Sequence, residues 1–341
     1  MASAKNPART LLSSFKELGL TATQVRHFLP EWWDDEVAGD DSGLLELQIL
    51  LARRLNVGLD SLQAAVPKPQ FRAATRRFKT VHPEGSSQLA VAAGVGHGLA
   101  QLLATSCKTA VFPRPLTAHA LRASILAKYP TANLEALCHW LWDHGVPVVH
   151  IQNWPKQLRR PDAMCVRVGD RPVVLAVRQD STLARLTYLV AHEVGHIMLG
   201  HLQADDNAVL VDDTLPVDEV GGAKDADETA ADAFAMELLG GEALRAASRG
   251  LGPHVEELKL AAAASRAGRG TGLDAGQIVL GWARLNGDWK LAAKAMWYLT
   301  TTQAAPVVVN DVAKHYIDFE AVSGDAHEHL TQLTGMQFHD E

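Results

Sequence analysis

The chain has 341 residues, enough for two or three domains, and 47% of them are apolar, which excludes a disordered or fibrous protein. Its 32 Lys and Arg against 39 Asp and Glu leave a formal net charge of −7, so the chain as a whole lacks the positive field of a dedicated nucleic-acid binder. Three widely spaced cysteines, Cys107, Cys138 and Cys165, argue against a disulfide framework and indicate a reducing cytoplasm.

Two segments bear on membrane targeting. Residues 1–9 are polar and no apolar run follows them, so we expect no secretory signal. Residues 85–107 carry no Asp, Glu, Lys or Arg, but their many Ala, Gly, Ser and Gln residues supply too little transfer free energy for a stable membrane span. We therefore predict a buried, Ala-rich helix in that segment and no membrane partner.

A small helical module is predicted over residues 1–66. Apolar residues recur at helical spacing from residue 11 to residue 18, and Thr21 can cap a second helix that runs to Leu29. Residues 44–55 form a third predicted helix. The module is thus expected to fold around its own leucines.

Parts of this module resemble a helix-turn-helix domain of the XRE repressor family. Residues 21–29 are similar to the first helix of that family's reading pair, and residues 47–62 are similar to the C-terminal half of the domain. The family's recognition helix would fall on residues 31–36, whose sequence here is Glu-Trp-Trp-Asp-Asp-Glu, with Asp40 and Asp41 following. Six carboxylates would face the phosphates of DNA.

This acidic segment changes what the resemblance implies. Carboxylates repel the DNA backbone by more than Arg53 and Arg54, on the following helix, can offset, so we expect residues 1–66 alone to bind no duplex DNA at about 150 mM salt. Two alternatives stay open for the module. It docks a basic protein surface, such as the DNA-binding face of a substrate, or it packs on the rest of the chain through Trp32 and Trp33.

Residues 67–130 are predicted to form a linker and a helical segment. The stretch 67–80 is rich in Lys and Arg, and we interpret it as a connector that runs into a basic helix. A solvated connector and a contact with nucleic acid or an acidic protein both fit its composition. Further helices are predicted over residues 87–105 and 118–128, separated by two prolines.

Residues 131–240 show the clearest alternation of helix and strand. Apolar residues from 134 to 141 lie on one face of a helix that Gly145 ends, and residues 146–151 form a short apolar strand. Two further strands are predicted at residues 163–168 and 172–178. A small antiparallel sheet is expected here.

The last two strands are joined by Gly169-Asp170-Arg171, a hairpin signal because glycine adopts the positive φ of a tight turn. Ser181 is expected to cap a long helix that runs to about His201 and lies across the sheet. We also expect the strands at residues 163–168 and 172–178 to supply an edge to which an extended peptide adds as a further strand.

The predicted long helix carries the pattern His192-Glu193-Val194-Gly195-His196. Residues four apart on a helix lie one above the other, so both imidazoles can bind one metal ion while Glu193 projects beside them. This is the zincin arrangement, in which Glu193 takes a proton from the attacking water and passes it to the leaving amine. We predict one Zn²⁺ per chain.

A catalytic zinc site needs a third protein ligand, and two residues are candidates. His201 follows His196 by five residues, which is not the metzincin spacing, so it is the weaker candidate. Glu228 lies on a later predicted helix, where Asp232 projects from the same side four residues on. One carboxylate can bind the metal while the other accepts a hydrogen bond from a ligating histidine. We predict Glu228 as the ligand and Asp232 as the residue that orients the histidine.

Residues 133–240 resemble the ImmA/IrrE family of cytoplasmic zinc metallopeptidases. The resemblance rests on residues 189–199, which hold the histidine pattern, and on residues 228–239, which include Glu228 and Phe234. Asp232 stands where the family usually has Asn, and a Gly pair at 240–241 replaces its usual Met-Pro.

The resemblance implies a gluzincin-like endopeptidase that cleaves a protein partner, commonly an XRE-type repressor, in a response to stress, DNA damage, phage or a mobile element. The expected fold class is α+β and mostly helical, with a zincin-like core flanked by helical N-terminal and C-terminal regions. A peptidase of this kind also needs a group that stabilises the oxyanion of the transition state. Tyr188, Arg185 and His201 are the nearest polar candidates in the sequence.

Residues 241–341 are predicted to be helical, with amphipathic helices over residues 278–285 and 291–299. We expect their tryptophans to lie in the core; these are Trp282, Trp289 and Trp297. Only residues 306–310 have a β-like composition. The region does not resemble the GAF-like sensor domain found in relatives of that family.

Two other classes of function compete with an endopeptidase. The chain can be a DNA-binding regulator whose zincin portion is structural or sensory, or an interaction protein of the toxin-antitoxin kind whose Trp32 and Trp33 anchor a partner. The presence of Glu193 favours the enzyme, because a structural metal site has no need for a general base. The acidic segment of the N-terminal module argues against a DNA reader.

Overall fold

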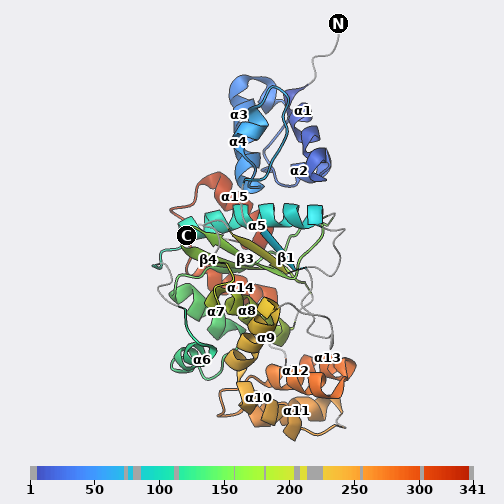
Figure 1. The fold of residues 1–341 in the computed structure, drawn as a ribbon, viewed down its shortest axis with the longest axis vertical. Helices are drawn as coiled ribbons and strands as arrows, with labels where there is room; N and C mark the ends of the chain where they lie inside the picture. The colour runs from blue at the N-terminus through green and yellow to red at the C-terminus, as the bar shows by residue number, and fades with distance from the viewer. Residues whose placement is uncertain are drawn as a thin grey trace.

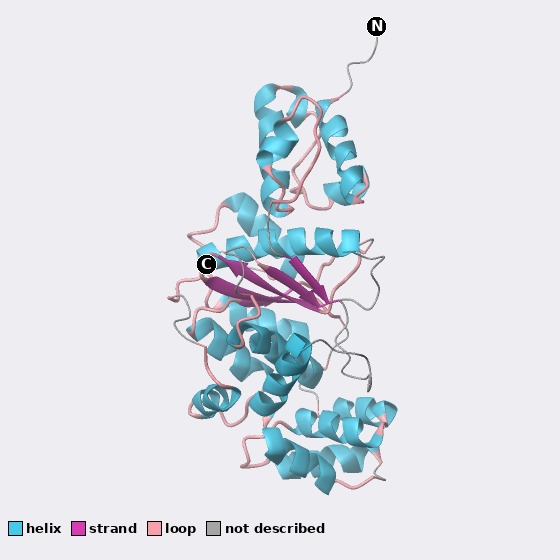
Figure 2. Ribbon diagram, viewed as in Figure 1, coloured by secondary structure: helices cyan, strands magenta, loops and turns pink. Residues whose placement is uncertain are grey.

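The computed structural model describes residues 6–72, 76–79, 86–110, 115–156, 158–179, 182–202, 208–212, 226–253, 256–299 and 303–337. Within these residues the protein is α+β and mostly helical (Figure 2). Helices of the N-terminal part lie at one end, a sheet covered by helices lies in the middle, and a group of helices lies at the other end (Figure 1).

The N-terminal part is helical, as predicted. Thr21 forms a full capping box with Gln24 at the start of the second α-helix, because each side chain bonds to the other residue's backbone N–H. The elements are α1 (Pro7–Ser14), η1 (Phe15–Leu18), α2 (Ala22–Arg26), η2 (Val37–Gly39), α3 (Asp41–Arg54) and α4 (Leu59–Gln63).

The segment where a recognition helix was expected is not a helix. Residues 31–36 form turns, and α2 ends at Arg26 rather than at Leu29. Pro30 disfavours helical backbone at the residue before it, and the Asp34 side chain accepts a hydrogen bond from the N–H of Glu36, which stabilises a local turn. The acidic residues therefore do not line a helix that could enter a DNA groove.

The sheet has five strands in the order β1-β5-β3-β4-β2, and it is mixed rather than antiparallel. β3 pairs antiparallel with β4 and β5, whereas β1 pairs parallel with β5 and β2 pairs parallel with β4. The strands are β1 (Arg76–Lys79), β2 (Val148–His150), β3 (Ala163–Val168), β4 (Arg171–Ala176) and β5 (Val209–Asp212). The predicted hairpin at Gly169 is present between β3 and β4.

Two predictions about the sheet are wrong. The basic stretch 67–80 contains β1, where a helix was expected. The hairpin strands β3 and β4 lie inside the sheet, so they do not supply the free edge that we expected for a peptide. At β2, one of the two edges of the described sheet, Asn310 accepts a hydrogen bond from His150 N and donates one to His150 O, and so covers the strand's outer backbone groups.

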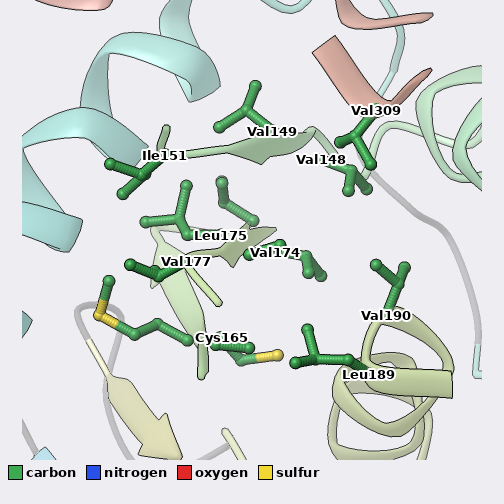
Figure 3. Packing of buried hydrophobic residues seen from close by; sticks show 14 of the residues in the cluster. Val148, Val149, Ile151, Cys165, Val174, Leu175, Val177, Leu189, Val190 and Val309 are labelled. Carbon is green, nitrogen blue, oxygen red and sulfur yellow. The ribbon is translucent and has the colours of Figure 1, made fainter. Parts of the chain in front are cut away.

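Helices cover both faces of the sheet (Figure 1). One face is covered by α5 (Ser86–Ser106), the Ala-rich helix predicted over residues 85–107. Among the described residues it is the one helix long and apolar enough to cross a membrane, and 72% of its most apolar window is buried inside the fold. The other face is covered by α7 (Leu134–Asp143), α8 (Leu183–Met198) and α14 (Ala305–Lys314). Figure 3 shows aliphatic side chains of α8 and α14 beside those of the strands.

The N-terminal part docks on α5 through the end of α3. A Cβ atom at Gly98 would lie 2.6 Å from Arg53 O and 2.7 Å from Arg54 O, so these backbones meet only because Gly98 has no side chain. The buried Arg54 guanidinium donates to Phe28 O and to Asp325 O of α15 (Gly324–Thr334). Arg54 thus helps join the two parts, whereas Trp32 is 47% exposed.

The C-terminal region is helical throughout its described residues but is divided in space (Figure 1). One group, named here the C-terminal helical unit, packs below α8 and α9 (Ala226–Leu239); it comprises α10 (Gly241–Gly250), α11 (Glu257–Gly268), α12 (Ala275–Asn286) and α13 (Trp289–Trp297). The last two helices, α14 and α15, return to the sheet and to the N-terminal part. α6 (Ala118–Leu126) packs against α9.

Two predictions about this region are wrong. Residues 306–310, predicted to be β-like, lie in α14, where Pro306 occupies the first turn that tolerates proline. Trp297 is 80% exposed, because it is the last residue of α13 and lies outside the face that packs on α11 and α12. Trp282 is fully buried, as expected, and Trp289 is half-buried.

Candidate metal centre

The predicted histidine pattern lies on α8, which is buried on nearly all sides. The helix begins at Leu183, and its cap is Thr182, whose side chain accepts from Arg185 N. Ser181, which we expected to be the cap, lies outside the described residues. The apolar residues of α8 pack on the strands and α7, so His192, Glu193 and His196 are held with no exposed surface.

α9 crosses α8 at close range and brings the carboxylates to the histidines. A Cβ atom at Gly195 would lie 2.9 Å from Ala231 O and 3.0 Å from Ala231 Cα, so glycine permits this approach. Ala231 lies between Glu228 and Asp232 on α9. The Gly in the histidine pattern thus has a packing role that the pattern alone did not reveal.

His192, His196 and Glu228 form a group whose candidate ligand atoms all lie within 4.8 Å of one another. The two Nε2 atoms are 3.0 Å apart. One oxygen of Glu228 lies 3.4 Å from His192 Nε2, and the other lies 3.4 Å from His196 Nε2. These are the three residues that the sequence predicted as ligands, and the two imidazoles come from one helix and the carboxylate from another.

Asp232 lies on the outer side of His192. Its Oδ1 accepts from His192 Nδ1 at 3.0 Å and from the hydroxyl of Tyr188 at 2.6 Å. A carboxylate accepts hydrogen bonds, so this contact favours the His192 tautomer with its proton on Nδ1 and a lone pair on Nε2. Asp232 therefore occupies the orienting position that was predicted for it.

Tyr188 is one of the three residues predicted as a stabiliser of the transition state. Burial raises its pKa to about 12, so it remains a protonated donor to Asp232 at neutral pH. Its hydroxyl hydrogen is thus directed to a carboxylate that holds a histidine. Tyr188 is therefore linked to the orientation of the His192 ring through Asp232, which accepts a hydrogen bond from both residues.

His201 lies on the outer side of His196, just beyond the end of α8. The two Nδ1 atoms are 2.7 Å apart, and His201 Nε2 lies 3.6 Å from the Asp227 carboxylate. A proton on His201 Nε2 is favoured by that carboxylate, which leaves His201 Nδ1 to accept from His196 Nδ1. His201 therefore stands where it can orient His196 and is not part of the ligand group.

The donor set fits a zinc ion. Two imidazole nitrogens and one carboxylate oxygen form the ligand set of His₂Glu catalytic zinc sites, which keep one position open. In the tautomers described above, both Nε2 atoms present lone pairs to the same small space, and Glu228 adds a negative charge there. A cation relieves the repulsion that these three groups otherwise share.

Glu193 follows the ligand residue His192 on α8 and is not a member of the ligand group. Its side chain is fully buried, and its backbone carbonyl accepts from the thiol of Cys165 on β3 at 3.2 Å. This bond ties the middle of α8 to the sheet. A buried carboxylate adjacent in sequence to a metal ligand is suited to proton transfer, because little water competes for it.

Arg284 of α12 was not identified from the sequence. Its guanidinium carbon lies 4.4 Å from the centre of the Tyr188 ring, and it also contacts the sulfur of Met236 on α9. No local signal marks this arginine, because it lies 92 positions after His192. Arg185, the remaining predicted candidate, lies two helical turns before His192 on α8 and is half-buried; its role remains a prediction.

No protein-family model, no curated protein and no solved structure matches this chain. The chemistry of the centre is therefore inferred from its own donor atoms, their burial and the hydrogen bonds behind them.

Proposed function

We propose that the protein is a zinc-dependent endopeptidase, of the gluzincin-like kind that its resemblance to the ImmA/IrrE family implies. The observation that carries the proposal is the convergence of His192 and His196 with Glu228, which comes from a second helix; the buried Glu193 follows His192 in the sequence. A purely structural site is usually closed by four protein ligands. Three ligands with an adjacent base are typical of a hydrolytic site.

Each residue has a distinct role in this proposal. His192, His196 and Glu228 would hold the zinc, which when bound polarises the scissile carbonyl and makes the attacking water more acidic. Glu193 takes the proton from that water and transfers it to the leaving amine. Asp232 and His201 support the two histidines through their Nδ1 atoms.

The candidates for stabilising the oxyanion can be ordered by what they bond. Tyr188 directs its hydroxyl to Asp232, and His201 directs Nδ1 to His196, so both act on residues of the metal site. Arg185 stays the candidate of the original three for the substrate oxyanion. A peptide would have to approach elsewhere than β3 and β4, since both strands are paired on both sides.

The proposed substrate is a cytoplasmic protein, and an XRE-type repressor is the class that the family resemblance implies. The contacts of the N-terminal part favour packing on the rest of the chain over DNA binding. Arg54 is buried against α15, and the acidic segment is not helical. We therefore propose that the substrate is a protein rather than a nucleic acid.

The deciding experiment compares the purified chain with Glu193→Gln. Both proteins are assayed for zinc by elemental analysis and incubated with a proteome-derived peptide library whose new termini are read by mass spectrometry. The proposal expects about one zinc per chain in both and cleavage by the wild type alone. A structural or sensory zinc module would instead bind zinc in both proteins and cleave nothing, and a protein without metal would contradict both.

A further inference from the structure

Arg284 reaches the metal centre from a part of the fold that supplies none of its ligands. It lies on α12 of the C-terminal helical unit, and its guanidinium carbon is 4.4 Å from the centre of the Tyr188 ring on α8. The same guanidinium contacts Met236 on α9. One side chain thus bridges the two helices that carry the ligands.

The contact continues to a ligand through two hydrogen bonds. The Tyr188 hydroxyl donates to Asp232 Oδ1 at 2.6 Å, and the same oxygen accepts from His192 Nδ1 at 3.0 Å. Because both donors use one oxygen, the angle at which Asp232 meets His192 depends on where the Tyr188 hydroxyl lies. The sequence of contacts is therefore Arg284, Tyr188, Asp232 and His192.

The Tyr188 ring is packed in the core and lies 6.4 Å from the His192 ring, centroid to centroid. It is 4% exposed, and the cation over its face supplies a directional attraction as well as packing. The side chain of Arg284 itself is anchored by α12, which packs directly on α8. A shift of the C-terminal helical unit would therefore move the cation relative to the Tyr188 ring.

We infer that Arg284 is a positioning residue of the metal centre, and that the C-terminal helical unit controls the orientation of His192 through it. The inference rests on the proposed zinc site, since the orientation matters only if His192 is a ligand. In this role Arg284 binds neither the metal nor the substrate. Its effect passes through Tyr188 and Asp232.

The test measures zinc affinity of the full chain by competition with a chromophoric chelator. Supporting residues behind a ligand typically change metal affinity by roughly 10- to 100-fold, and Arg284 acts one contact further away, so Arg284→Met is expected to weaken zinc binding by roughly 3- to 10-fold. Arg284→Lys keeps a cation over the ring and is expected to restore most of the affinity. Arg245→Met on α10, an exposed arginine that pairs with Glu242, is the control and is expected to change nothing.

A double-mutant cycle decides whether the effect passes through the tyrosine. In a Tyr188→Phe background the hydroxyl is gone, so Arg284→Met is expected to weaken zinc binding by less than about twofold further. The visible spectrum of the Co²⁺-loaded protein should change in the same direction in both single variants. If Arg284→Met fails to fold, the same comparison is made with Arg284→Gln.

The outcomes separate this inference from the proposed function. A wild type that binds no zinc removes the proposed function and this inference with it. A wild type that binds zinc with an affinity unaffected by Arg284→Met overturns this inference alone, as does an effect of full size in the Tyr188→Phe background. A loss that Arg284→Lys does not rescue also overturns it, because simple packing would then explain the effect.

Discussion

The Nε2 atoms of His192 and His196 face each other at 3.0 Å, while the Nδ1 atom of each ring bonds outward, to Asp232 and to His201. In the tautomers that these outer partners favour, two lone pairs share one space beside the Glu228 carboxylate. A cation in that space would relieve the repulsion among these three groups. The arrangement could hold a metal ion.

Replacement of Glu193 by Gln is expected to leave zinc binding at about one ion per chain and the melting temperature unchanged, because Glu193 is not a ligand and Gln has the same shape. Proteolysis is expected to be lost, since an amide cannot take the proton from water. Zinc content, a thermal melt and the peptide-library assay check the three statements. Loss of zinc from this variant would show that Glu193 is a ligand.

Replacement of Glu228 by Ala is expected to abolish tight zinc binding, because it removes one of three ligands. Asp232→Ala is expected to weaken zinc binding by a smaller factor, on the order of 10- to 100-fold, since it leaves all ligands in place but frees the His192 ring. Chelator competition measures both. The assignment would be reversed if His201→Ala removed the metal while Glu228→Ala retained it.

Gly195→Ala is expected to separate α9 from α8, because the new methyl group would lie 2.9 Å from Ala231 O. We expect a loss of about 1–3 kcal/mol in the free energy of unfolding, as overpacking costs, together with weaker zinc binding, because Glu228 moves with α9. Gly250→Ala is the matched control, since nothing lies within 4 Å of a Cβ there. Chemical denaturation and zinc titration provide the readouts; unchanged zinc affinity would show that the helix contact does not set the site.

The stability of the protein is expected to fall when the pH drops from 7 to 5. Burial lowers the pKa of His329 on α15 to about 3 from its usual 6.5, and the charge of Arg54 acts in the same direction. The unfolded chain therefore binds a proton below pH 6.5 that the folded chain binds only near pH 3, so stability is full above pH 6.5 and is lost between these values.

At pH 5, which is 1.5 units below the usual histidine pKa of 6.5, the loss in the free energy of unfolding is on the order of 2 kcal/mol for His329 alone. Denaturation at pH 7 and pH 5 measures it. His329→Asn is expected to reduce the pH dependence and leave the part due to buried His150, whose pKa is lowered to about 4, whereas His119→Asn, on the exposed side of α6, leaves it as in the wild type. Equal pH dependence in all three proteins would rule out His329 as its source.

Residues 1–66 alone are not expected to bind duplex DNA at about 150 mM salt. Of the two arginines at the end of α3, Arg54 is buried and donates to Phe28 O and Asp325 O, which leaves Arg53 facing solvent. Fluorescence anisotropy with random and promoter duplexes measures this. Salt-dependent binding tighter than roughly micromolar, the upper range of non-specific affinity, would contradict the expectation.

Features that depend on neighbours along the chain were predictable. The spacing of His192 and His196 places them on one face of any α-helix, and the four-residue spacing of Glu228 and Asp232 does the same on α9. The capping box at Thr21 and the hairpin at Gly169 follow from local hydrogen bonding and from the φ values that glycine permits. These signals were enough to predict the three residues that the structure brings together as a candidate metal-binding group.

Features that depend on residues far apart in the chain appeared only in three dimensions. A basic tetrapeptide became β1 because its backbone pairs with β5, and residues 306–310 became helical where they pack on β2 and α7. The position of Arg284 over Tyr188 likewise depends on how α12 meets α8. Propensity and periodicity describe one segment at a time, whereas strand pairing and helix packing are selected by the burial that distant segments provide together.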